Sequence, residues 1–410
     1  MLRGMLLAQQ GGIDATKAGN SRFPRRDISL LLLGNAISSS GDMAAYVALV
    51  LRLQGNGSSW VSALIAAEFL PPVVMGPLAG VLVDRFESRK VLLISLLGQA
   101  IVTLGLSFRL AAPATIVLVG LLACLSAFTR TGMRALVPNI AGSKGAARGY
   151  ARLSTGTTIG WIIGPAVGGL LTGHIGSGPT ILLDAFSFLV LWLFVLAISA
   201  RRPPQHPEEA AKQVERRPRY RPFHLMARDS VLRVALPLSA LAAGIAVVDN
   251  VAAPFRFVDQ LRAGASGFGV YETVWAVGAL AGVQLLAISR TMKRPDVLLA
   301  AGNMVMGAGI AGIGVATNFG LALVAAVIGG AGNGLSNASE SAVIQSRSPA
   351  DILGGVFGLN QGLVQVATAL GTLVAAPSVK FLGAALTMIS FGIVAAAASA
   401  VALTVAAVRK

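Results

Sequence analysis

The chain has 410 residues, of which 55% are hydrophobic and only 12% are charged, and its mean hydropathy is +0.74. Water-soluble domains carry roughly twice this share of charged residues, so the composition excludes a soluble globular protein and indicates a polytopic membrane protein. The net charge of +16 is spread over many loops, where basic residues would face anionic lipid headgroups, and this distribution argues against nucleic acid as a partner.

Apolar segments of about 20 residues recur along the chain, and this is the length at which a helix crosses a hydrocarbon core ~30 Å thick. Cutting the sequence at charges, prolines and Gly/Asn clusters predicts twelve membrane-spanning helices, so the expected fold class is an all-α integral membrane protein. The predicted spans lie near residues 28–51, 60–83, 91–108, 114–133, 154–173, 179–200, 233–254, 268–288, 297–315, 320–341, 355–377 and 384–407.

A polar segment rich in proline and mixed charge divides these spans six and six. It covers residues 201–230 and is typical of a cytoplasmic linker. The expected organisation is therefore an N-terminal cytoplasmic segment at 1–27, a six-helix bundle at 28–200, the linker, and a second six-helix bundle at 231–410.

The basic residues predict the orientation, because cytoplasmic loops are enriched in Lys and Arg. With both termini inside, 28 of the 33 lysines and arginines lie on the cytoplasmic side. The other five are Arg52, Arg109, Arg256, Arg262 and Lys380. The first residues do not read as a signal peptide, so we expect the first span to remain as the insertion signal of a multi-pass protein.

The two halves of the sequence superpose at one offset. Asp42 and Asp249 are 207 residues apart, and so are Gly164 and Gly371. An acid inside a membrane span is rare, which makes the first of these matches the more informative. The offset predicts an internal duplication, and a repeat of six helices with a binding site between the halves is a known transporter architecture.

Residues 80–90, between the second and third spans, read GVLVDRFESRK. A Gly, three residues, Asp-Arg and a basic cluster resemble the loop signature of the major facilitator superfamily. The matching residues are Gly80, Asp84, Arg85 and Arg89. Glu87 and Ser88 depart from the commonest form, and an acid after "DRF" resembles a subgroup of bacterial exporters that includes the enterobactin exporter and macrolide efflux proteins. The resemblance implies a cytoplasmic latch between the halves, and the alternative is a charged turn that only fixes topology.

The fifth span contains the stretch GTTIGWIIGPAVGG at residues 156–169. Its glycines and proline follow the spacing of the superfamily signature that is associated with exporters exchanging substrate for protons. These residues are Gly160, Gly164, Pro165, Gly168 and Gly169. Glycines at four-residue spacing let a neighbouring helix approach closely, and the proline permits a bend. We interpret the stretch as a packing and bending seam rather than a binding site.

The chemistry of such a protein must come from the few polar groups inside the spans. An ionisable side chain in hydrocarbon costs ~2.5 kcal/mol or more and is rarely kept without use. Burial also favours the neutral form of a carboxyl group, which suits a group that alternately binds and releases a proton. The candidates for proton coupling or substrate contact are Asp42, Asp249, Glu272, Tyr46, Asn250, Tyr271 and Trp275.

Other roles remain open for the acids. A structural hydrogen bond to a neighbouring backbone group or to an arginine is the alternative for Asp42, and a place at the outer interface is the alternative for Glu272. A role other than coupling or substrate contact is left open for Asp249. We expect Asp184 to be structural. Glu340 is expected to pair with an arginine, and the candidates are Arg130, Arg134 and Arg347.

Enzyme signatures are absent from the sequence, which has no HExxH, no P-loop lysine, no GxSxG and no clustered histidines. No metal or organic cofactor is expected, and a proton gradient is the expected energy source. The lone cysteine, Cys124, rules out a disulfide framework within the chain.

The resemblance and the intramembrane acids together predict a proton-coupled exporter of drugs, antibiotics or secondary metabolites. Its expected fold is two pseudo-symmetric six-helix bundles, and its expected place is a bacterial inner membrane with both termini cytoplasmic. The expected partners are the bilayer, a small-molecule substrate and protons, and the protein is expected to be monomeric. The alternatives are a lysolipid, siderophore or other solute transporter of the same fold, and a non-transporting membrane receptor.

Overall fold

The computed structural model describes residues 24–142, 145–199, 221–288, 294–349 and 352–408, and every regular element in these ranges is a helix. In chain order they are α2 (Pro24–Gln54), α3 (Ser58–Arg85), α4 (Ser88–Ser107), α5 (Ala112–Ala141), α6 (Ala146–Ile175), α7 (Ser177–Ala197), α9 (Arg221–Arg228), α10 (Leu232–Pro254), η2 (Phe255–Gln260), α11 (Gly264–Ile288), α12 (Pro295–Val315), α13 (Phe319–Arg347) and α14 (Leu353–Val408). Most of the predicted N-terminal segment and of the predicted linker lies outside the described residues.

Twelve membrane-crossing segments follow from these helices. Ten of the described helices are long and apolar enough to span a membrane. One of them, α14, is broken at Gly383, whose φ of 78° is a left-handed conformation that favours glycine, and the chain turns back there into a second helix. The more polar α2, which carries Asp27 and Arg52 in its end turns, supplies the remaining segment. The predicted fold class and number of spans are confirmed.

Several helices are longer than their predicted spans. α5 runs to Ala141 where the prediction ended near 133, and α6 begins at Ala146 instead of near 154. The prediction stopped at the arginines of these segments, such as Arg134 and Arg152. Arginine is nonetheless a good helix former and is tolerated wherever the helix has left the hydrocarbon. Charge therefore located the edge of the membrane rather than the end of the helix.

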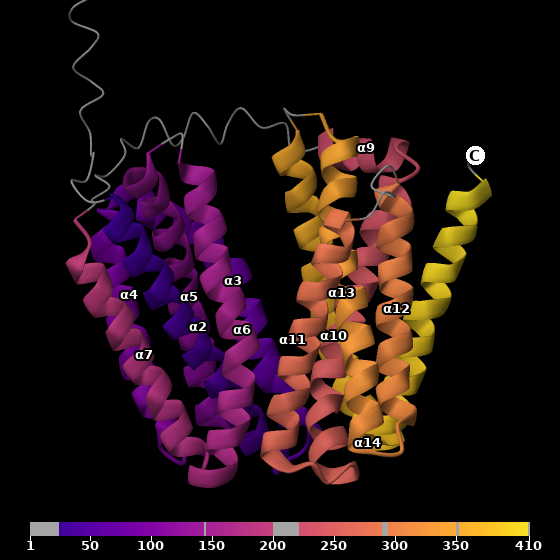
Figure 1. Cartoon of the computed structure of the whole chain (residues 1–410), viewed down its shortest axis with the longest axis horizontal. Coiled ribbons are helices and arrows are strands. Elements are labelled where there is room, and N and C mark those ends of the chain that lie inside the picture. The colour runs from indigo at the N-terminus through magenta and orange to yellow at the C-terminus, as the bar shows by residue number, and fades with distance from the viewer. Residues whose placement is uncertain (1–23, 143–144, 200–220, 289–293, 350–351, 409–410) are drawn as a thin grey trace, which may run out of the picture.

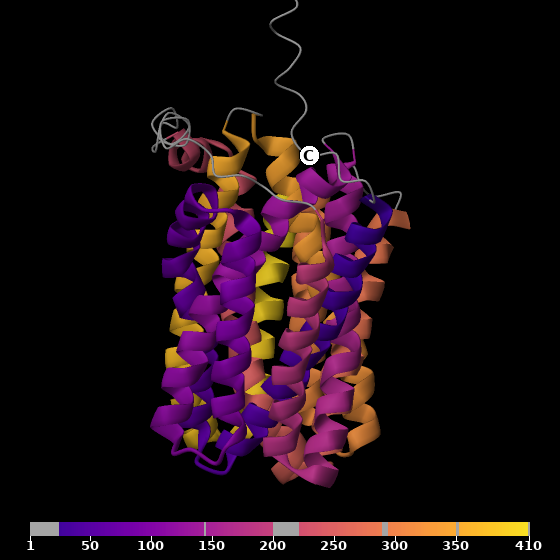
Figure 2. The ribbon, with the colours of Figure 1, turned by 90° about the vertical axis from the view of Figure 1, so that its left-hand side faces the viewer.

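The helices form two groups that lie side by side (Figure 1). α2 to α7 make the N-terminal group, and α10 to α14 make the C-terminal group with the short helix α9 at one end. The two groups meet at the end opposite α9 and diverge toward the α9 end. A view turned by 90° shows the helices running between the same two ends (Figure 2). We call the end opposite α9 the closed end.

Direct contacts join the two groups at the closed end. Gln54 Nε2 donates a hydrogen bond to Asp259 Oδ1 at 2.9 Å, and Ser58 Oγ donates to the carbonyl oxygen of Ala376 at 3.0 Å. The largest cluster of buried apolar side chains also contains residues of both groups, for example Ile65 of α3 and Val251 of α10. Apolar burial therefore reinforces the polar contacts that hold this end shut.

Each group uses one arginine to cap a helix at the closed end. Arg52, in the last turn of α2, donates from Nη1 to the carbonyl oxygen of Leu106 at the end of α4, at 2.7 Å. Arg256, in η2, donates from Nε to the carbonyl oxygen of Ile313 near the end of α12, at 3.1 Å. A guanidinium there satisfies carbonyls that lack a partner in the helix and opposes the negative end of the helix dipole. Leu106 and Ile313 are 207 residues apart, the offset that the sequence predicts for the duplication.

Replacing Arg256 with alanine is expected to destabilise the C-terminal group. The guanidinium of Arg256 also donates to Ala316 O and to Gln260 Oε1, so the substitution leaves several acceptors without a partner. Each buried unsatisfied group costs about 1–3 kcal/mol, and the apparent melting temperature in detergent should fall by several degrees. Heating followed by size-exclusion chromatography measures this. The matched variant Arg109→Ala removes an exposed arginine and should leave the melting temperature unchanged. An equal fall in both variants would contradict the capping role of Arg256.

Candidate functional site

Two carboxyl groups of the C-terminal group form the centre of the candidate site. Asp249 lies toward the closed end of α10, where only 3% of its surface is exposed, and Glu272 lies in the first third of α11. Tyr271 Oη donates to Asp249 Oδ2 at 2.9 Å. Asp249 Oδ1 and Glu272 Oε1 are buried and have no hydrogen-bond partner in the described part of the chain. The charge of Asp249 acts on the Glu272 carboxyl group, so the site holds two neighbouring acids that each keep one buried acceptor without a partner.

Aromatic side chains lie next to these carboxyl groups. The ring of Tyr271 stacks on Phe257, with centroids 4.2 Å apart, and lies 6.3 Å from the ring of Trp275. Tyr46 comes from α2 in the other group and lies close enough for the charges of both acids to act on its hydroxyl group. The structure thus brings together most of the predicted site residues, and it draws them from both groups.

Two predicted residues lie apart from this cluster. Asn250 follows Asp249 on α10 and is half-buried, and within the described residues its side chain makes no hydrogen bond to the cluster. Asp42 belongs to a second set of acids in the N-terminal group. None of the described histidines, cysteines and acids come together in groups of three that could hold a metal ion.

The second acidic cluster contains its own positive charge. The carboxyl group of Asp42 interacts electrostatically with Glu68, with Asp184 and with the guanidinium of Arg130. Asp184 Oδ1 accepts a hydrogen bond from Ser187 Oγ at 2.9 Å, which agrees with the structural role expected for this acid. The two clusters therefore differ, because Arg130 offsets part of the charge of Asp42 and Glu68 in the N-terminal group.

Glu68 is not among the predicted site residues, and the arginine left open as a partner of Asp42 was not identified as Arg130. Glu68 lies inside the second predicted span, and an ionisable residue in an apolar span is the same signal that identified Asp42. Arg130 was considered only as a partner of Glu340. Its proximity to Asp42 depends on how α5 packs beside α2, which the sequence does not display.

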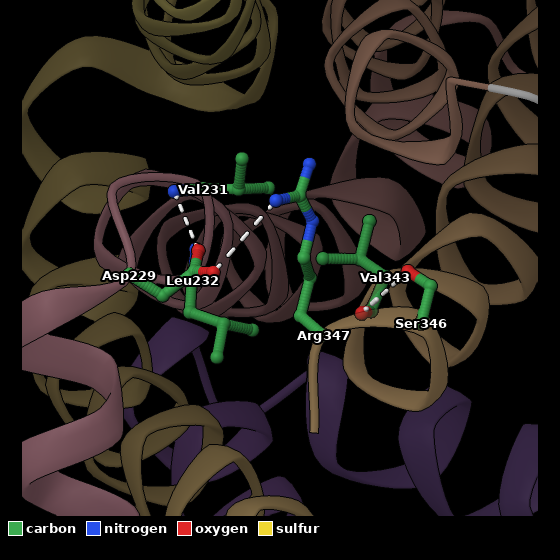
Figure 3. A network of polar contacts seen from close by, with 6 residues as sticks. All are labelled: Asp229, Val231, Leu232, Val343, Ser346 and Arg347. Atoms are coloured by element: carbon green, nitrogen blue, oxygen red, sulfur yellow. Dashed lines mark hydrogen bonds and ion pairs between the residues drawn. The ribbon is translucent and has the colours of Figure 1, made fainter. Parts of the chain in front are cut away.

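The predicted pairing of Glu340 with an arginine is wrong. Glu340 Oε1 accepts a hydrogen bond from Asn360 Nδ2 at 2.6 Å. Arg347 Nη1 instead lies 3.8 Å from Asp229 Oδ2 (Figure 3). Asp229 Oδ1 also accepts two backbone N–H groups at the start of α10, at 2.8 and 2.9 Å. Asp229 thus caps α10 and connects it to the end of α13.

The loop signature forms a shorter turn than predicted. α3 continues to Arg85 and α4 begins at Ser88, so only Phe86 and Glu87 connect them. Neither residue has a positive φ, and Glu87 forms an ion pair with Lys90 at 3.4 Å. The departure from the commonest family pattern therefore fits a tight turn that needs no glycine.

The other residues of this signature differ in their surroundings. Arg89 donates to the carbonyl oxygens of Val195 at 3.2 Å and Leu196 at 2.6 Å, which ties α4 to the end of α7. Asp84 is half-buried in the last turn of α3. A Cβ atom at Gly80 would meet no atom within 4 Å, so this face of α3 is open at the α9 end.

The glycines of α6 face two different helices. Cβ atoms at three of them would lie 2.6 Å from backbone atoms of α2, and these are Gly160, Gly164 and Gly168. Gly169 faces α11 in the other group, where a Cβ atom would lie 2.8 Å from Cα of Gly269. Pro165 lies inside α6, which continues past it as one helix. The contacts agree with a packing seam, and Gly169 extends the seam to the boundary between the groups.

Residues 31–372 match the family model of the Major Facilitator Superfamily. Among curated proteins, the chain is similar to the multidrug efflux pump Tap of Mycolicibacterium fortuitum, at 28% identity over 90% of this chain and 95% of Tap. It is also similar to macrolide efflux protein A of Enterococcus faecalis, at 21% identity over 77% of this chain and 99% of that protein.

Two solved structures resemble the chain over almost its full length. One is a peptide transporter POT, with a TM-score of 0.74 at 14% identity over 97% of both chains. The other is a bacterial homologue of the human lysosomal transporter Spinster in an inward-facing and unoccupied conformation, with a TM-score of 0.72 at 14% identity over 94% of this chain and 98% of that one. At these identities the likeness concerns the fold alone.

Proposed function

The chain belongs to the major facilitator superfamily, and we propose that it is a secondary active exporter that moves small molecules out of the cell in exchange for protons. Family membership makes it a membrane transporter rather than an enzyme. The efflux relatives support the direction of transport, because Tap aligns with nearly the whole chain. The substrates would be drugs, antibiotics or secondary metabolites.

The positions of the basic residues support a cytoplasmic α9 end. The five basic residues predicted on the outer side all lie at the closed end, in the last turns of helices or in the loops that follow them. They are Arg52, Arg109, Arg256, Arg262 and Lys380. Since cytoplasmic loops carry the excess of Lys and Arg, the closed end would face outward and the divergent end inward. We place the protein in a bacterial inner membrane, as a monomer with both termini in the cytoplasm.

The observation that carries the proton exchange is the buried pair Asp249 and Glu272. An ionised carboxyl group without a counter-charge is strongly disfavoured in a protein interior, so closing the outer end over this pair favours the protonated form. A proton taken up from outside would stay bound to the pair while that end closes. In the inward-facing form the substrate would displace it. Asp42, whose charge Arg130 offsets in part, is the second candidate for this role.

The conformational cycle would be a rocking of the two bundles about the site between them. The loop signature would latch the cytoplasmic side, and the open face of α3 at Gly80 is the surface available for it. The glycine seam of α6 would keep α2 and α6 in close contact throughout. The latch residues are Gly80, Asp84, Arg85 and Arg89, and the seam residues are Gly160, Gly164, Pro165, Gly168 and Gly169.

The test is substrate-driven proton movement in inverted membrane vesicles that report their internal pH through a dye. Vesicles that hold the protein should release protons when a substrate is added from a panel of macrolides, amphipathic cations and neutral drugs. Vesicles from cells without the protein provide the control. If no compound moves protons although the protein is folded and inserted, the proposal fails, and lysolipid or siderophore transport should be tested next.

A further inference from the structure

We propose that α9 and the arginines beside it bind an anionic phospholipid of the cytoplasmic leaflet. The side chain of Phe223 would lie among the acyl chains, while Arg228, Arg233 and Arg347 would hold the phosphate of the headgroup. This site lies at the start of α10, whereas Asp249 lies toward its other end. In the proposed orientation α9 faces the cytoplasm, and the site would bind lipid whichever molecule the protein transports.

α9 lies across the end of the C-terminal group (Figure 1), and the view turned by 90° places it at the edge of the molecule (Figure 2). One face of this helix packs on the protein, where Leu225 and Met226 adjoin the apolar cluster that contains Val356. On the same face, a Cβ atom at Gly355 would lie 2.6 Å from Cγ of Pro222. An isolated helix of 8 residues is not stable in water, so this packing holds α9 in place. A helix held crosswise where the long helices end is positioned to lie in the headgroup layer.

The rest of α9 presents an apolar flank and a polar flank. Phe223 and Ala227 are one turn apart and are therefore neighbours on the helix surface, and the same holds for His224 and Arg228. All four side chains are exposed, and 62% of the surface of Phe223 is accessible. A phenyl ring is stabilised when it leaves water for an apolar phase, which acyl chains beside α9 would provide. A helix with a docked face, an apolar flank and a polar flank is suited to the boundary between acyl chains and headgroups.

Three arginines lie near one carboxylate where α9 meets α10. Asp229 and Arg347 point toward each other, with Arg347 Nη1 3.8 Å from Asp229 Oδ2, and Asp229 Oδ1 accepts two backbone N–H groups (Figure 3). Arg228 directly precedes Asp229, and Arg233 lies one turn after it, where its backbone N–H donates to the carbonyl oxygen of Asp229 at 3.0 Å. Arg228 and Arg233 are exposed, and neither forms an ion pair with another described residue. The local excess of guanidinium groups favours an anion, and their paired N–H donors match the oxygens of a phosphate.

A phospholipid fits this surface better than a soluble anion does. Water and salt screen the attraction between an exposed arginine and a free phosphate, so such a pair is weak. A basic patch on an anionic leaflet meets a high local density of headgroups, and an apolar anchor beside it supplies the second signal that stable membrane attachment needs. Phe223 and the arginines supply both signals. Because Asp229 caps α10, Arg347 ends α13 and α9 packs on the start of α14, a bound lipid would stabilise three helix ends of the C-terminal group together.

The test uses the purified full-length protein in detergent micelles, with a fluorophore on Ala227→Cys in a Cys124→Ser background. Phospholipids with brominated acyl chains quench this fluorophore when they lie beside α9. Brominated phosphatidylglycerol should reach half-maximal quenching at a mole fraction about tenfold lower than brominated phosphatidylcholine, since only the first carries a net negative charge. Arg228→Gln combined with Arg233→Gln should reduce this preference to less than about threefold.

The matched control combines Arg148→Gln with Arg152→Gln. These two exposed arginines belong to α6 at the same end of the protein, so the control makes the same change of charge away from α9 and should keep the preference. Phe223→Ser should weaken quenching by both lipids about fivefold and leave their ratio unchanged, because it removes only the apolar anchor. All the substituted side chains are exposed, so the variants should fold, which size-exclusion chromatography checks.

Several outcomes would overturn the lipid site. These are equal quenching by the two lipids in the wild type, no quenching by either lipid, an equal loss of preference in the α6 control, and unchanged quenching in Phe223→Ser. Inorganic phosphate, compared with sodium chloride at the same ionic strength, distinguishes a lipid from a soluble anion. Displacement of the brominated lipid by phosphate and not by chloride would assign the arginines to a soluble anion instead. The assay contains no gradient and no transported molecule, so its outcome is independent of the test of export.

Discussion

Asp249→Asn is expected to abolish substrate-driven proton movement in inverted vesicles, with a fall of roughly a hundredfold, the scale of a positioned proton-transfer group. Asparagine has nearly the same volume, and its amide oxygen can still accept the hydroxyl hydrogen bond of Tyr271, which now measures 2.9 Å. The amide cannot bind and release a proton near neutral pH. The variant should therefore fold and insert but fail to couple, which the dye response on adding substrate measures directly.

Three companion variants make this result interpretable. Glu340→Gln removes a carboxyl group that accepts from Asn360 at the α9 end, and it should transport as the wild type does. Asp42→Asn removes an acid whose charge Arg130 already offsets in part, and it should have the smaller effect. Tyr271→Phe should retain coupling but alter its pH profile, because it removes the hydrogen bond to Asp249. Full proton movement in Asp249→Asn, or loss only in Asp42→Asn, would transfer the coupling role to the N-terminal group.

The fold could be predicted from the sequence because the membrane imposes a length and a polarity on every span. The break in α14 illustrates this, since the predicted spans 355–377 and 384–407 flank Gly383, whose positive φ reverses the chain. The ends of α5 and α6 were misplaced for the same reason, because polarity reports where the bilayer ends and not where the backbone stops being helical. Alternation of the spans also placed Arg52 and Arg256 at one end, although their capping of α4 and α12 was not foreseen.

The site could be predicted only in part. Asp249 and Tyr271 were singled out separately, but their hydrogen bond joins residues 22 positions apart on different helices. Tyr46 reaches the same cluster from the other group, and no periodicity in the sequence encodes that approach. Glu68 carried a readable signal as an acid in an apolar span. Glu340 was assigned an arginine because opposite charges attract, yet an amide on α14 lies closer.

Gly169→Val is expected to hold the closed end open. A Cβ atom at Gly169 would lie 2.8 Å from Cα of Gly269. The nearest atoms all belong to the backbone of α11, so no flexible side chain can move aside to make room. Overpacking of this kind costs about 1–3 kcal/mol, which shifts an equilibrium between closed and open forms by about tenfold. Cross-linking of Gln54→Cys to Asp259→Cys by a short bis-thiol reagent, in a Cys124→Ser background, measures closure, because the two native side chains are joined by a 2.9 Å hydrogen bond in the closed form. The yield should fall by about tenfold.

Gly168→Val is the matched control, since the same bulk is added one residue earlier. Its Cβ atom would lie 2.6 Å from Cα of Ala44 in α2, inside the N-terminal group. It should therefore lower the thermal stability of the protein, while the molecules that remain folded still cross-link at the closed end. If Gly169→Val instead lost stability and kept a normal cross-link yield, the contact with Gly269 would not belong to the gate. Adjacent glycines that face different helices thus distinguish packing within one bundle, which the cycle must preserve, from packing between bundles, which it must break and remake.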